Sequence, residues 1–534
     1  MKVRLSLALL LLYVNSDCVD AGDLLSADHS IPQAIDHYIN ARLQQAGVTP
    51  APQATDAMLV RRLTLDLAGR IPSPVEVTAF TQSKDADRRK QLIKRLVHSP
   101  WYVRHAATEF NTLLRGPSGG GPDLRDYLLT AVRENRPWNQ MFRELLGVSS
   151  AEAKPERFVL GRLKDRDLLT RDASSLFFGV NISCAQCHTH PYVESLTQDY
   201  FFGMQAFFSR SYDFEGALLE RKFGTKVKFT TNAGEPREVG AMFLVGRAIE
   251  TPAPDVPDVA KAISDEQKRI DVLRKKFKEA KTEDPKSEPE MPTDADYSLR
   301  AQLVEIALQP ENEVLVAKSI VNRMCLRFYG YALVTRVDQM HEWNEPSHPE
   351  LLAWLARDLI AHGYDLRRLV SGLVSSTTYS RSSRWAGDAP PRELFAVANL
   401  RPLTPMQFGV SIVCCGEVPN DDEARIKNIE EQARKHFGEL IEQPYDGLQI
   451  DAAEALGMSN DSERLKVVGA NLVPQLLKLR DHDAQIEAAF QHVLSRAPTQ
   501  IEASALAEYL AQHKDALPQV VWALTTSTEF RFNH

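Results

Sequence analysis

The sequence predicts a mainly α-helical protein, with two helical domains separated by a small β element and a charged linker. Three observations support this prediction. Apolar residues recur at helical spacing over residues 31–215 and again over 297–534. Alternating strand-forming residues gather in 226–249. The chain of 534 residues, 43% hydrophobic and 25% charged, is long enough for more than one domain with a core of its own.

The first residues predict export. Met1–Arg4 is basic, an apolar run follows over Leu5–Val14, and small residues precede Gly22. This pattern is typical of a secretory signal peptide, which we expect over residues 1–21. The apolar run is shorter than the about 20 residues that span a bilayer, and an uncleaved anchor is the alternative. No later segment is apolar for that length, so we expect no transmembrane segment in the mature chain and a periplasmic or extracellular location.

Residues 31–215 are predicted to form the first helical domain. Ser73-Pro74-Val75-Glu76 is a capping box with proline at the first helical position, so a helix should begin there. A second helix should end at Ser99-Pro100. Asp165–Val180 also has a helical pattern, with Thr170 as its candidate cap. The second of these helices carries four apolar residues at helical spacing, namely Leu92, Ile93, Leu96 and Val97.

Residues 216–296 are predicted to connect the two domains. Lys226–Ile249 alternates and is rich in strand formers, which favours two or three short strands. Ile263–Lys281 predicts a charged helix, and Thr282–Pro292 is acidic and contains proline. The composition of these last two segments indicates a linker without a core of its own.

Residues 297–534 are predicted to form the second helical domain. Apolar residues keep a helical period from Leu303 to Met324. Ser347-His348-Pro349-Glu350 is a second predicted capping box, and it should open a helix that stops at His362-Gly363. The last helices are expected over residues 484–494, 500–513 and 518–527.

The strongest chemical signal is the stretch Cys184-Ala185-Gln186-Cys187-His188. Two cysteines three positions apart, followed at once by histidine, have the spacing that attaches a c-type haem. Cys184 and Cys187 would form thioethers with the two vinyl groups of one porphyrin. His188 would then reach the iron as its proximal ligand. The expected cofactor is therefore haem c, in a protein that transfers electrons or carries out redox chemistry on an extracytoplasmic substrate.

Other interpretations of this CxxCH motif stay open. A haem would need a sixth ligand or an open position, and Met204 and Met242 are the candidate ligands. His190 is close in sequence to His188 and could not easily swing across the porphyrin. Zinc is the alternative cofactor, bound by the two thiolates with His188 or His190 and by ligands from distant parts of the chain. A structural or redox disulfide between the two cysteines is the third interpretation.

The residues around the motif and the other cysteines have simpler interpretations. The aromatic run over Asp199–Phe208 could form core, wall a porphyrin, or do both. Cys325 and the adjacent Cys414-Cys415 are expected to be small buried hydrophobic residues. Cysteine is too sparse for a disulfide framework.

The rest of the sequence excludes several functions. The net charge of −8 and the absence of a basic stripe argue against a nucleic-acid partner. The chain has no phosphate-binding glycine-rich loop, no Gly-x-Ser-x-Gly elbow and no His-Glu-x-x-His motif. One further polar group could bind a metal or a sugar, although capping of a helix explains part of it better. Its members are Asp338, His341, Glu342 and His348.

A set of short stretches along most of the chain resembles one protein family. In the first domain these are Arg61-Arg62-Leu63-Thr64-Leu65-Asp66-Leu67, Ile71-Pro72-Ser73-Pro74, Asn135-Arg136-Pro137-Trp138, the CxxCH motif with His190-Pro191, and Asp199-Tyr200-Phe201. In the second domain they are Pro310-Glu311-Asn312, Val321-Asn322-Arg323, Phe328-Tyr329-Gly330, Ser347-His348-Pro349-Glu350-Leu351-Leu352, Gly363-Tyr364-Asp365 and Ser527–His534. On these stretches the chain resembles the secreted planctomycete proteins that join two domains of unknown function, DUF 1549 and DUF 1553.

The resemblance implies little about activity. The first domain of that family is also called planctomycete cytochrome-c-like domain 2, a name that agrees with a haem at CxxCH. It would imply an exported redox partner, or other exported enzymes as partners. The competing implication is a non-redox cell-surface module linked to polysaccharide breakdown, in which CxxCH holds zinc or a disulfide. Cys325 departs from the family, which usually has tryptophan there.

Overall fold

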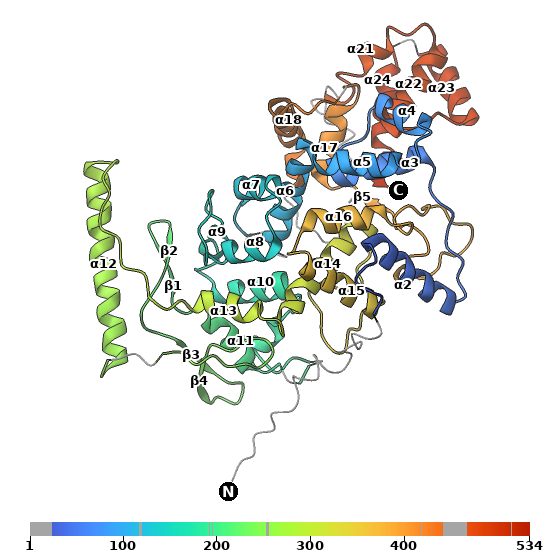
Figure 1. The fold of residues 1–534 in the computed structure, drawn as a ribbon. Helices are drawn as coiled ribbons and strands as arrows, with labels where there is room; N and C mark the ends of the chain where they lie inside the picture. Colours follow the sequence, from blue (N-terminus) through green and yellow to red (C-terminus); the bar gives the residue numbers. More distant parts are fainter. Residues whose placement is uncertain are drawn as a thin grey trace.

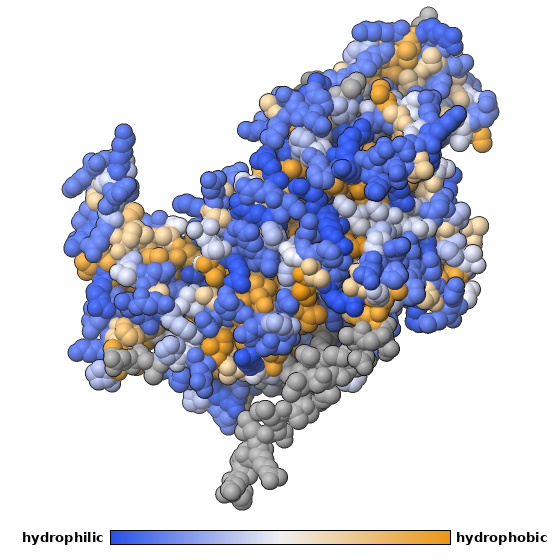
Figure 2. All heavy atoms as spheres, viewed as in Figure 1, coloured by the Kyte–Doolittle hydropathy of each residue, from blue (hydrophilic) through white to orange (hydrophobic). Residues whose placement is uncertain are grey.

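The computed structural model describes residues 24–116, 120–191, 193–194, 196–252, 256–417, 419–441, 467–513 and 515–534. The predicted signal peptide lies outside these ranges. Over the described residues the fold is mainly α-helical, as predicted, with three two-stranded antiparallel sheets (Figure 1). No helix in these ranges combines the length and the apolar character needed to cross a membrane. Hydrophilic residues cover most of the face drawn in Figure 2, with hydrophobic residues in separate groups between them.

Short helices build the first part of the chain. They are α2 (Ile31–Gln45), α3 (Asp56–Ala68), α4 (Pro74–Gln82), α5 (Arg88–Val97), α6 (Pro100–Leu114), α7 (Arg125–Arg133), α8 (Trp138–Leu145), α9 (Arg157–Leu160), α10 (Arg166–Phe178) and α11 (Gln198–Ala206). The capping box at Ser73 is confirmed, because its hydroxyl accepts from Glu76 N while the Glu76 carboxylate accepts from Ser73 N. The four predicted apolar residues of α5 are the buried ones. Ser99 also caps α6, which the sequence analysis did not assign.

The predicted cap of α10 is wrong. Asp165 caps this helix, because its carboxylate accepts a hydrogen bond from Leu168 N at 2.8 Å. Thr170 lies inside the helix, where its hydroxyl donates to Arg166 O at 2.7 Å. A carboxylate one residue before the first helical position satisfies the free N–H groups directly, and Thr170 begins too late to do so.

Two β-hairpins and one long helix follow. The first hairpin pairs β1 (Ser211–Phe214) with β2 (Ala217–Glu220), and the second pairs β3 (Lys226–Thr230) with β4 (Pro236–Gly240). α12 (Val259–Glu283) projects at one side of the molecule (Figure 1). It is anchored by a small cluster in which Ile270 packs with Tyr212 and Phe214, a contact that the sequence did not predict.

Helices again dominate the remaining chain. They are α13 (Leu299–Ala307), α14 (Glu313–Tyr329), α15 (Pro349–Ala361), α16 (Leu366–Ser375), α17 (Pro405–Cys414), α18 (Glu423–Ile441), α21 (Val473–Leu476), α22 (His482–Leu494), α23 (Gln500–Gln512), α24 (Leu517–Thr526) and α25 (Thr528–Arg531). Strands β5 (Arg401–Pro402) and β6 (Phe532–Asn533) pair antiparallel, so the last residues lie beside the segment before α17. The predicted capping box at Ser347 does not form, because the cap position of α15 is His348 and it makes no side-chain cap hydrogen bond.

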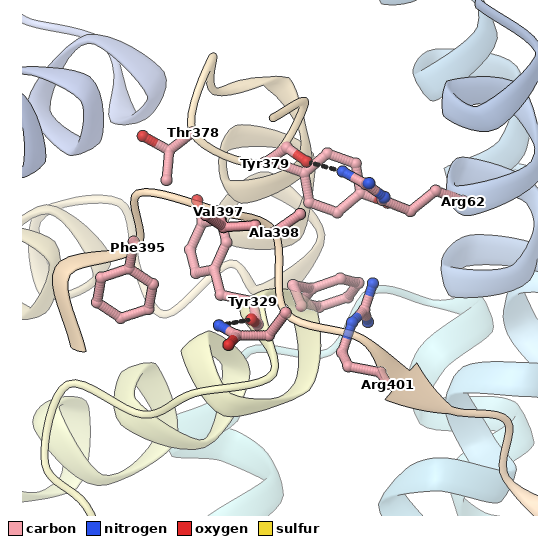
Figure 3. Close-up of a pocket in the computed structure, with 10 residues that line it drawn as sticks. Arg62, Tyr329, Thr378, Tyr379, Phe395, Val397, Ala398 and Arg401 are labelled. Atoms are coloured by element: carbon pink, nitrogen blue, oxygen red, sulfur yellow. Dashed lines mark hydrogen bonds between the residues drawn. The ribbon is translucent and has the colours of Figure 1, made fainter. Parts of the chain in front are cut away.

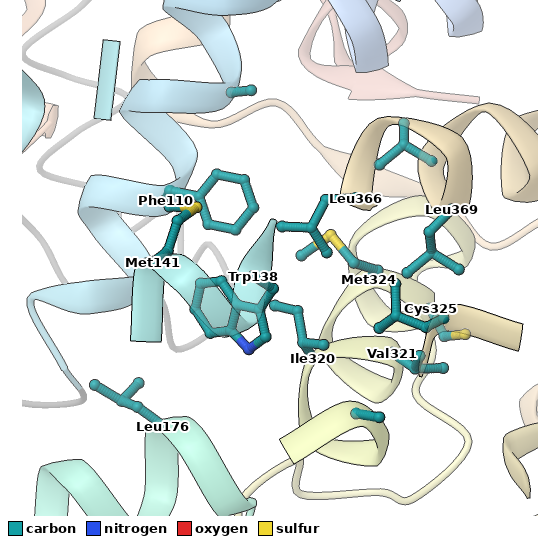
Figure 4. Close-up of a cluster of buried hydrophobic side chains, with 14 of the residues drawn as sticks. Phe110, Trp138, Met141, Leu176, Ile320, Val321, Met324, Cys325, Leu366 and Leu369 are labelled. Carbon is teal, nitrogen blue, oxygen red and sulfur yellow. The ribbon is translucent and has the colours of Figure 1, made fainter. Parts of the chain in front are cut away.

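One hydrophobic core joins both halves of the chain. Within it, α10 packs against α14, and α2 packs against α15 and α16. Figure 4 shows side chains of both halves meeting there; among them are Phe110, Trp138, Met141, Leu176, Ile320, Met324, Cys325, Leu366 and Leu369. The domain boundaries expected from the sequence stay predictions. Because the core is shared, separating the halves would expose apolar surface on both.

A second core lies under the C-terminal helices. Residues of α22 and α24 pack there with Phe408 of α17. Leu65 of α3 and Ile71 belong to this core too, although they are far away in sequence. Residues at the end of α3 and just after it are therefore packed with the last helices of the chain.

Candidate functional site: the CxxCH turn

The CxxCH motif forms a tight surface turn between α10 and α11. Its first residues lie in a short 3₁₀ turn, η1 (Ser183–Gln186), and the backbone N–H groups of Cys187 and His188 donate to Cys184 O. Ala185 is fully buried and fixes the turn to the core. Cys184 and Cys187 are both exposed and free. The turn therefore presents two unpaired thiols to solvent.

The His188 side chain is exposed and has a defined tautomer. Its Nδ1 lies 2.7 Å from the carbonyl oxygen of Thr189. A carbonyl oxygen can only accept, so Nδ1 carries the proton. The lone pair is then on Nε2, at the outer end of the ring. A histidine that ligates a metal commonly holds its other ring N–H in this way.

Hydrogen bonds from α10 and α11 hold the middle of the motif. Gln186 Nε2 donates to Asp167 Oδ2 at 2.6 Å, and Gln205 Nε2 donates to Asp167 Oδ1 at 2.5 Å. The backbone carbonyl of Gln186 accepts from Gln198 Nε2 at 3.1 Å. Asp167 belongs to α10 and both other glutamines belong to α11, so the turn is fixed between these two helices.

A segment of the second half of the chain holds the motif from another side. We call residues 336–344 the strap. Asn181 N donates to Asp338 O at 2.6 Å, and Met340 N donates to Gly179 O at 2.9 Å. Gly179 has a φ of +69°, and a Cβ there would lie 2.5 Å from Met340 Sδ. The left-handed backbone at this position and the close approach of Met340 both favour glycine just before the motif.

The strap also brings a histidine, His341, next to His190 beside the motif. The rings of buried His190 and of His341 pack edge to face, with centroids 5.6 Å apart. His190 Nδ1 accepts from Val193 N, and His341 Nδ1 accepts from Trp343 N. Burial and the nearby His188 lower the pKa of His190. Burial and His190 likewise lower the pKa of His341. The structure therefore places His341 against His190, two residues after His188, and the sequence did not predict this contact.

The two candidate methionines have different surroundings. Met204 is fully buried in the main core on α11. Met242 is half-buried and packs over Gly203, whose carbonyl accepts from Met242 N at 3.1 Å. Their roles as sixth ligands stay predictions.

The aromatic run over Asp199–Phe208 is mainly core. Phe201, Phe207 and Phe208 are fully buried. Phe202 is half-buried and stacks on Phe229 of β3 with ring centroids 4.1 Å apart.

The donor groups of the turn suit the chemistry of a c-type haem. Thioether formation requires accessible thiols, which Cys184 and Cys187 provide, and iron ligation requires a free imidazole nitrogen, which is Nε2 of His188. A tetrahedral zinc site would require four donors. The described residues contain no group of three or more His, Cys, Asp or Glu side chains that could hold a metal ion.

The polar residues expected near His348 do not form one group. His348 is buried beside Phe395, with ring centroids 5.5 Å apart, whereas His341 packs on His190. Asp338 is tied to Asn181 through both its backbone and its side chain. The capping interpretation holds only in that His348 occupies the cap position of α15.

Sequence analysis missed a buried polar network around Asp66, which we call the Asp66 network. The Asp66 carboxylate accepts from Arg401 at 2.6 and 2.7 Å, from the Tyr379 hydroxyl at 2.7 Å and from Asn533 Nδ2 at 2.8 Å. Arg62 donates to the backbone carbonyl of Tyr379 (Figure 3). The pocket beside them measures about 10 Å³, which is room for about one water molecule. The signal was visible as charged residues inside the apolar stretch Arg61–Leu67.

Two family models match separate stretches of the chain. Residues 34–213 match the family model PSCyt2, a protein of unknown function (DUF1549). Residues 299–434 match PSD1, a protein of unknown function (DUF1553). The name PSCyt2 suggests a cytochrome-like domain. The CxxCH turn lies in the first match and the strap in the second. No curated protein and no solved structure gives a significant match.

Proposed function

The chain belongs to the family that joins a DUF1549 segment to a DUF1553 segment, and on this premise we propose that it is an exported c-type cytochrome. Cys184 and Cys187 would anchor the haem, and His188 would be its proximal ligand. The observation that carries the proposal is the state of the motif, with two exposed thiols beside an imidazole whose Nε2 is free. The haem would supply one-electron chemistry for exchange with an exported redox partner.

The surrounding residues would orient this site. Thr189 O holds the proton on Nδ1 of His188, which keeps Nε2 in the form that can ligate iron. Asp167 holds the side chain of Gln186, which lies between the two cysteines, against α10. The strap ties the DUF1553 segment to the same turn. In this proposal the second segment is a support for the haem site.

The spectrum of the reduced protein in alkaline pyridine tests the proposal. The full chain would be exported in a host that attaches c-type haem, beside a Cys184→Ala, Cys187→Ala double variant. We expect a sharp α-band and haem that stays with the denatured wild-type chain, and neither in the double variant. A Cys325→Ala variant, which loses a buried thiol, is the matched control and should keep the band.

The absence of a band in folded wild-type protein from that host would overturn the cytochrome proposal. The alternative is then a non-redox cell-surface module, with CxxCH holding zinc or a disulfide. Metal analysis after purification without chelator, together with a count of reactive thiols, separates these two forms. Bound zinc that is lost in the double variant would identify a metal site. Two missing thiols without metal would identify a disulfide.

A further inference from the structure

A basic cleft lies beside Gln205, whose partner Asp167 also holds Gln186 of the CxxCH turn. Its volume is about 390 Å³, within the range of small-molecule sites. It opens between α10, α11, β3 and α12. The residues that line it are Arg166, Gln205, Ser209, Arg221, Phe223, Gly224, Lys226, Val227, Lys228 and Ile263. We call it the basic cleft.

Four of these lining residues are cations and none is a carboxylate. Arg166 makes one long hydrogen bond, to Ser211 O at 3.4 Å, and Arg221 lies over the ring of Tyr212 at 5.4 Å from its centre. Neither arginine forms an ion pair with a carboxylate of the described chain. Burial, and after it the charge of Arg221, lower the pKa of Arg166. Arg166 remains accessible to solvent and Arg221 is half-buried, so water screens the repulsion of the two like charges and both stay available to an anion.

The nearest carboxylates have other partners. Asp167 accepts from Gln186 and Gln205. Glu266 accepts from Lys222 N at 2.8 Å. Glu238 lies 3.6 Å from Lys226 and 4.0 Å from Lys228, whose side chains are 60% and 85% exposed. Such exposed, long ion pairs neutralise the lysines only weakly. The lining of the cleft therefore carries four cations that its own side chains do not neutralise.

The cleft also has an apolar wall. Phe223, Val227 and Ile263 line it beside the cations. A site that combines a few convergent charges with apolar side chains suits a small organic molecule better than a bare ion. Two guanidinium groups are well matched to the oxygens of a phosphate, sulfate or carboxylate group.

We propose that the basic cleft binds a small organic molecule carrying an oxyanion, with Arg166 and Arg221 on the oxyanion and Phe223 against its apolar part. This site uses none of the CxxCH side chains, and therefore stands or falls independently of the haem. It is also close to that motif in the hydrogen-bond network, because Gln205 lines the cleft and shares Asp167 with Gln186.

Calorimetric titration of the full chain tests the proposal, with phenyl phosphate, phenyl sulfate and benzoate as probes and phenol as the neutral counterpart. We expect at least one oxyanion probe to bind with a Kd below about 1 mM, and phenol to bind at least about tenfold more weakly. Inorganic phosphate and sulfate measure the contribution of the oxyanion alone. The strongest binder identifies which oxyanion the cleft prefers. Equal binding of phenol and the three oxyanions, or no binding by any of them, would overturn the proposal.

Variants assign the binding to the cleft. An Arg166→Gln, Arg221→Gln variant should weaken the best probe by about tenfold or more. Arg480→Gln removes an arginine whose side chain is 87% exposed and far away in sequence, and should change nothing. Lys226→Gln, at an exposed position where folding is not at risk, should weaken binding by about threefold. Unchanged affinity in both cleft variants would rule out this cleft. The same titration on the Cys184→Ala, Cys187→Ala chain separates this result from that of the haem.

Discussion

The Asp66 network and the CxxCH turn both carry ionisable side chains, but those of the network are buried and those of the turn are exposed. Asp66 is buried and accepts hydrogen bonds from Arg401, Tyr379 and Asn533. The thiols of Cys184 and Cys187 are exposed and free. Both regions carry stretches on which the chain resembles its family. Their surroundings, and not their place in a motif, separate a residue that holds the fold together from one that is available for chemistry.

The cysteines repeat this contrast within one residue type. Cys325, Cys414 and Cys415 are buried, as predicted, and burial raises the pKa of each thiol to about 12. A thiol in that state is an inert apolar side chain at neutral pH. Cys184 and Cys187 have no such cover. We therefore expect substitutions of the buried residues to lower the free energy of unfolding more than substitutions in the CxxCH turn do.

Removal of the central carboxylate should have the largest effect. Asp66→Ala would remove the carboxylate that pairs with largely buried Arg401, and with it four hydrogen bonds, two from Arg401 and one each from Tyr379 and Asn533. We expect a loss of about 3–5 kcal/mol in the free energy of unfolding, measured by urea titration. Asp56→Ala on the same helix is the control, because its ion pair with Arg88 is partly exposed, and it should lose less than about 1 kcal/mol. Similar losses in the two variants would show that the Asp66 network does not stabilise the packing of α3 against Tyr379, Arg401 and Asn533.

The second effect is pH dependence at the edge of the same network. His105 is buried, and its Nε2 accepts from Arg327 at 3.0 Å, with Glu109 and Asp66 nearby. Burial, and after it the charge of Arg327, lower the pKa of His105 from 6.5 to about 4. The unfolded chain binds a proton first as the pH falls, so stability is present above pH about 6.5 and decreases down to about 4. This single group would remove up to about 3 kcal/mol.

Unfolding titrations at several pH values can isolate this contribution. A His105→Gln variant keeps an acceptor for Arg327 but cannot titrate, so its stability should decrease less steeply between pH about 6.5 and 4. His98, which is exposed at the end of α5, provides the control variant His98→Gln. His348, whose pKa burial also lowers to about 4, should retain part of the slope in both variants. Parallel profiles for wild type and His105→Gln would contradict the assignment.

Local signals explain what the sequence predicted of the fold. The capping box at Ser73, the apolar face of α5 and the stop at His362-Gly363 depend on residues within one helix. Contacts distant in sequence explain what it missed. α17 and α18 were not assigned, and the packing of α12 on the first hairpin depends on Tyr212 and Phe214. The capping box predicted at Ser347 was wrong because the path of the chain between the strap and α15 puts His348 at the cap position, and the local pattern does not determine that path.

For the candidate site too, the sequence predicted the local pattern and missed the contacts between distant segments. The spacing of Cys184, Cys187 and His188 follows from the order of the residues, and the exposed turn agrees with it. Nothing in the sequence relates His341 to His190, since the strap lies some 150 positions further along the chain. The basic cleft likewise assembles from four separate elements. Such groupings depend on tertiary contacts that no local period encodes.

The third prediction concerns a serine substitution at a buried cysteine. Cys325 is fully buried between the two halves of the chain (Figure 4). Cys325→Ser would place a hydroxyl there without a partner, which should cost about 1–3 kcal/mol in the free energy of unfolding. Urea titration measures the loss, and Cys325→Ala, which adds no polar atom, should be less destabilising than serine. A serine variant as stable as wild type would show that the hydroxyl finds a partner in this core.

The smallest expected effect completes the comparison. Cys184→Ser and Cys187→Ser change exposed side chains, so in protein prepared without haem the free energy of unfolding should change by less than about 0.5 kcal/mol. In the same preparation two thiols of the native wild type should react rapidly with a thiol reagent, and the three buried ones only after unfolding. The double variant should lose the rapid phase and keep the slow one. A loss of stability comparable with that of Cys325→Ser would mean that the turn depends on its thiols for structure, and the contrast between the two regions would then fail.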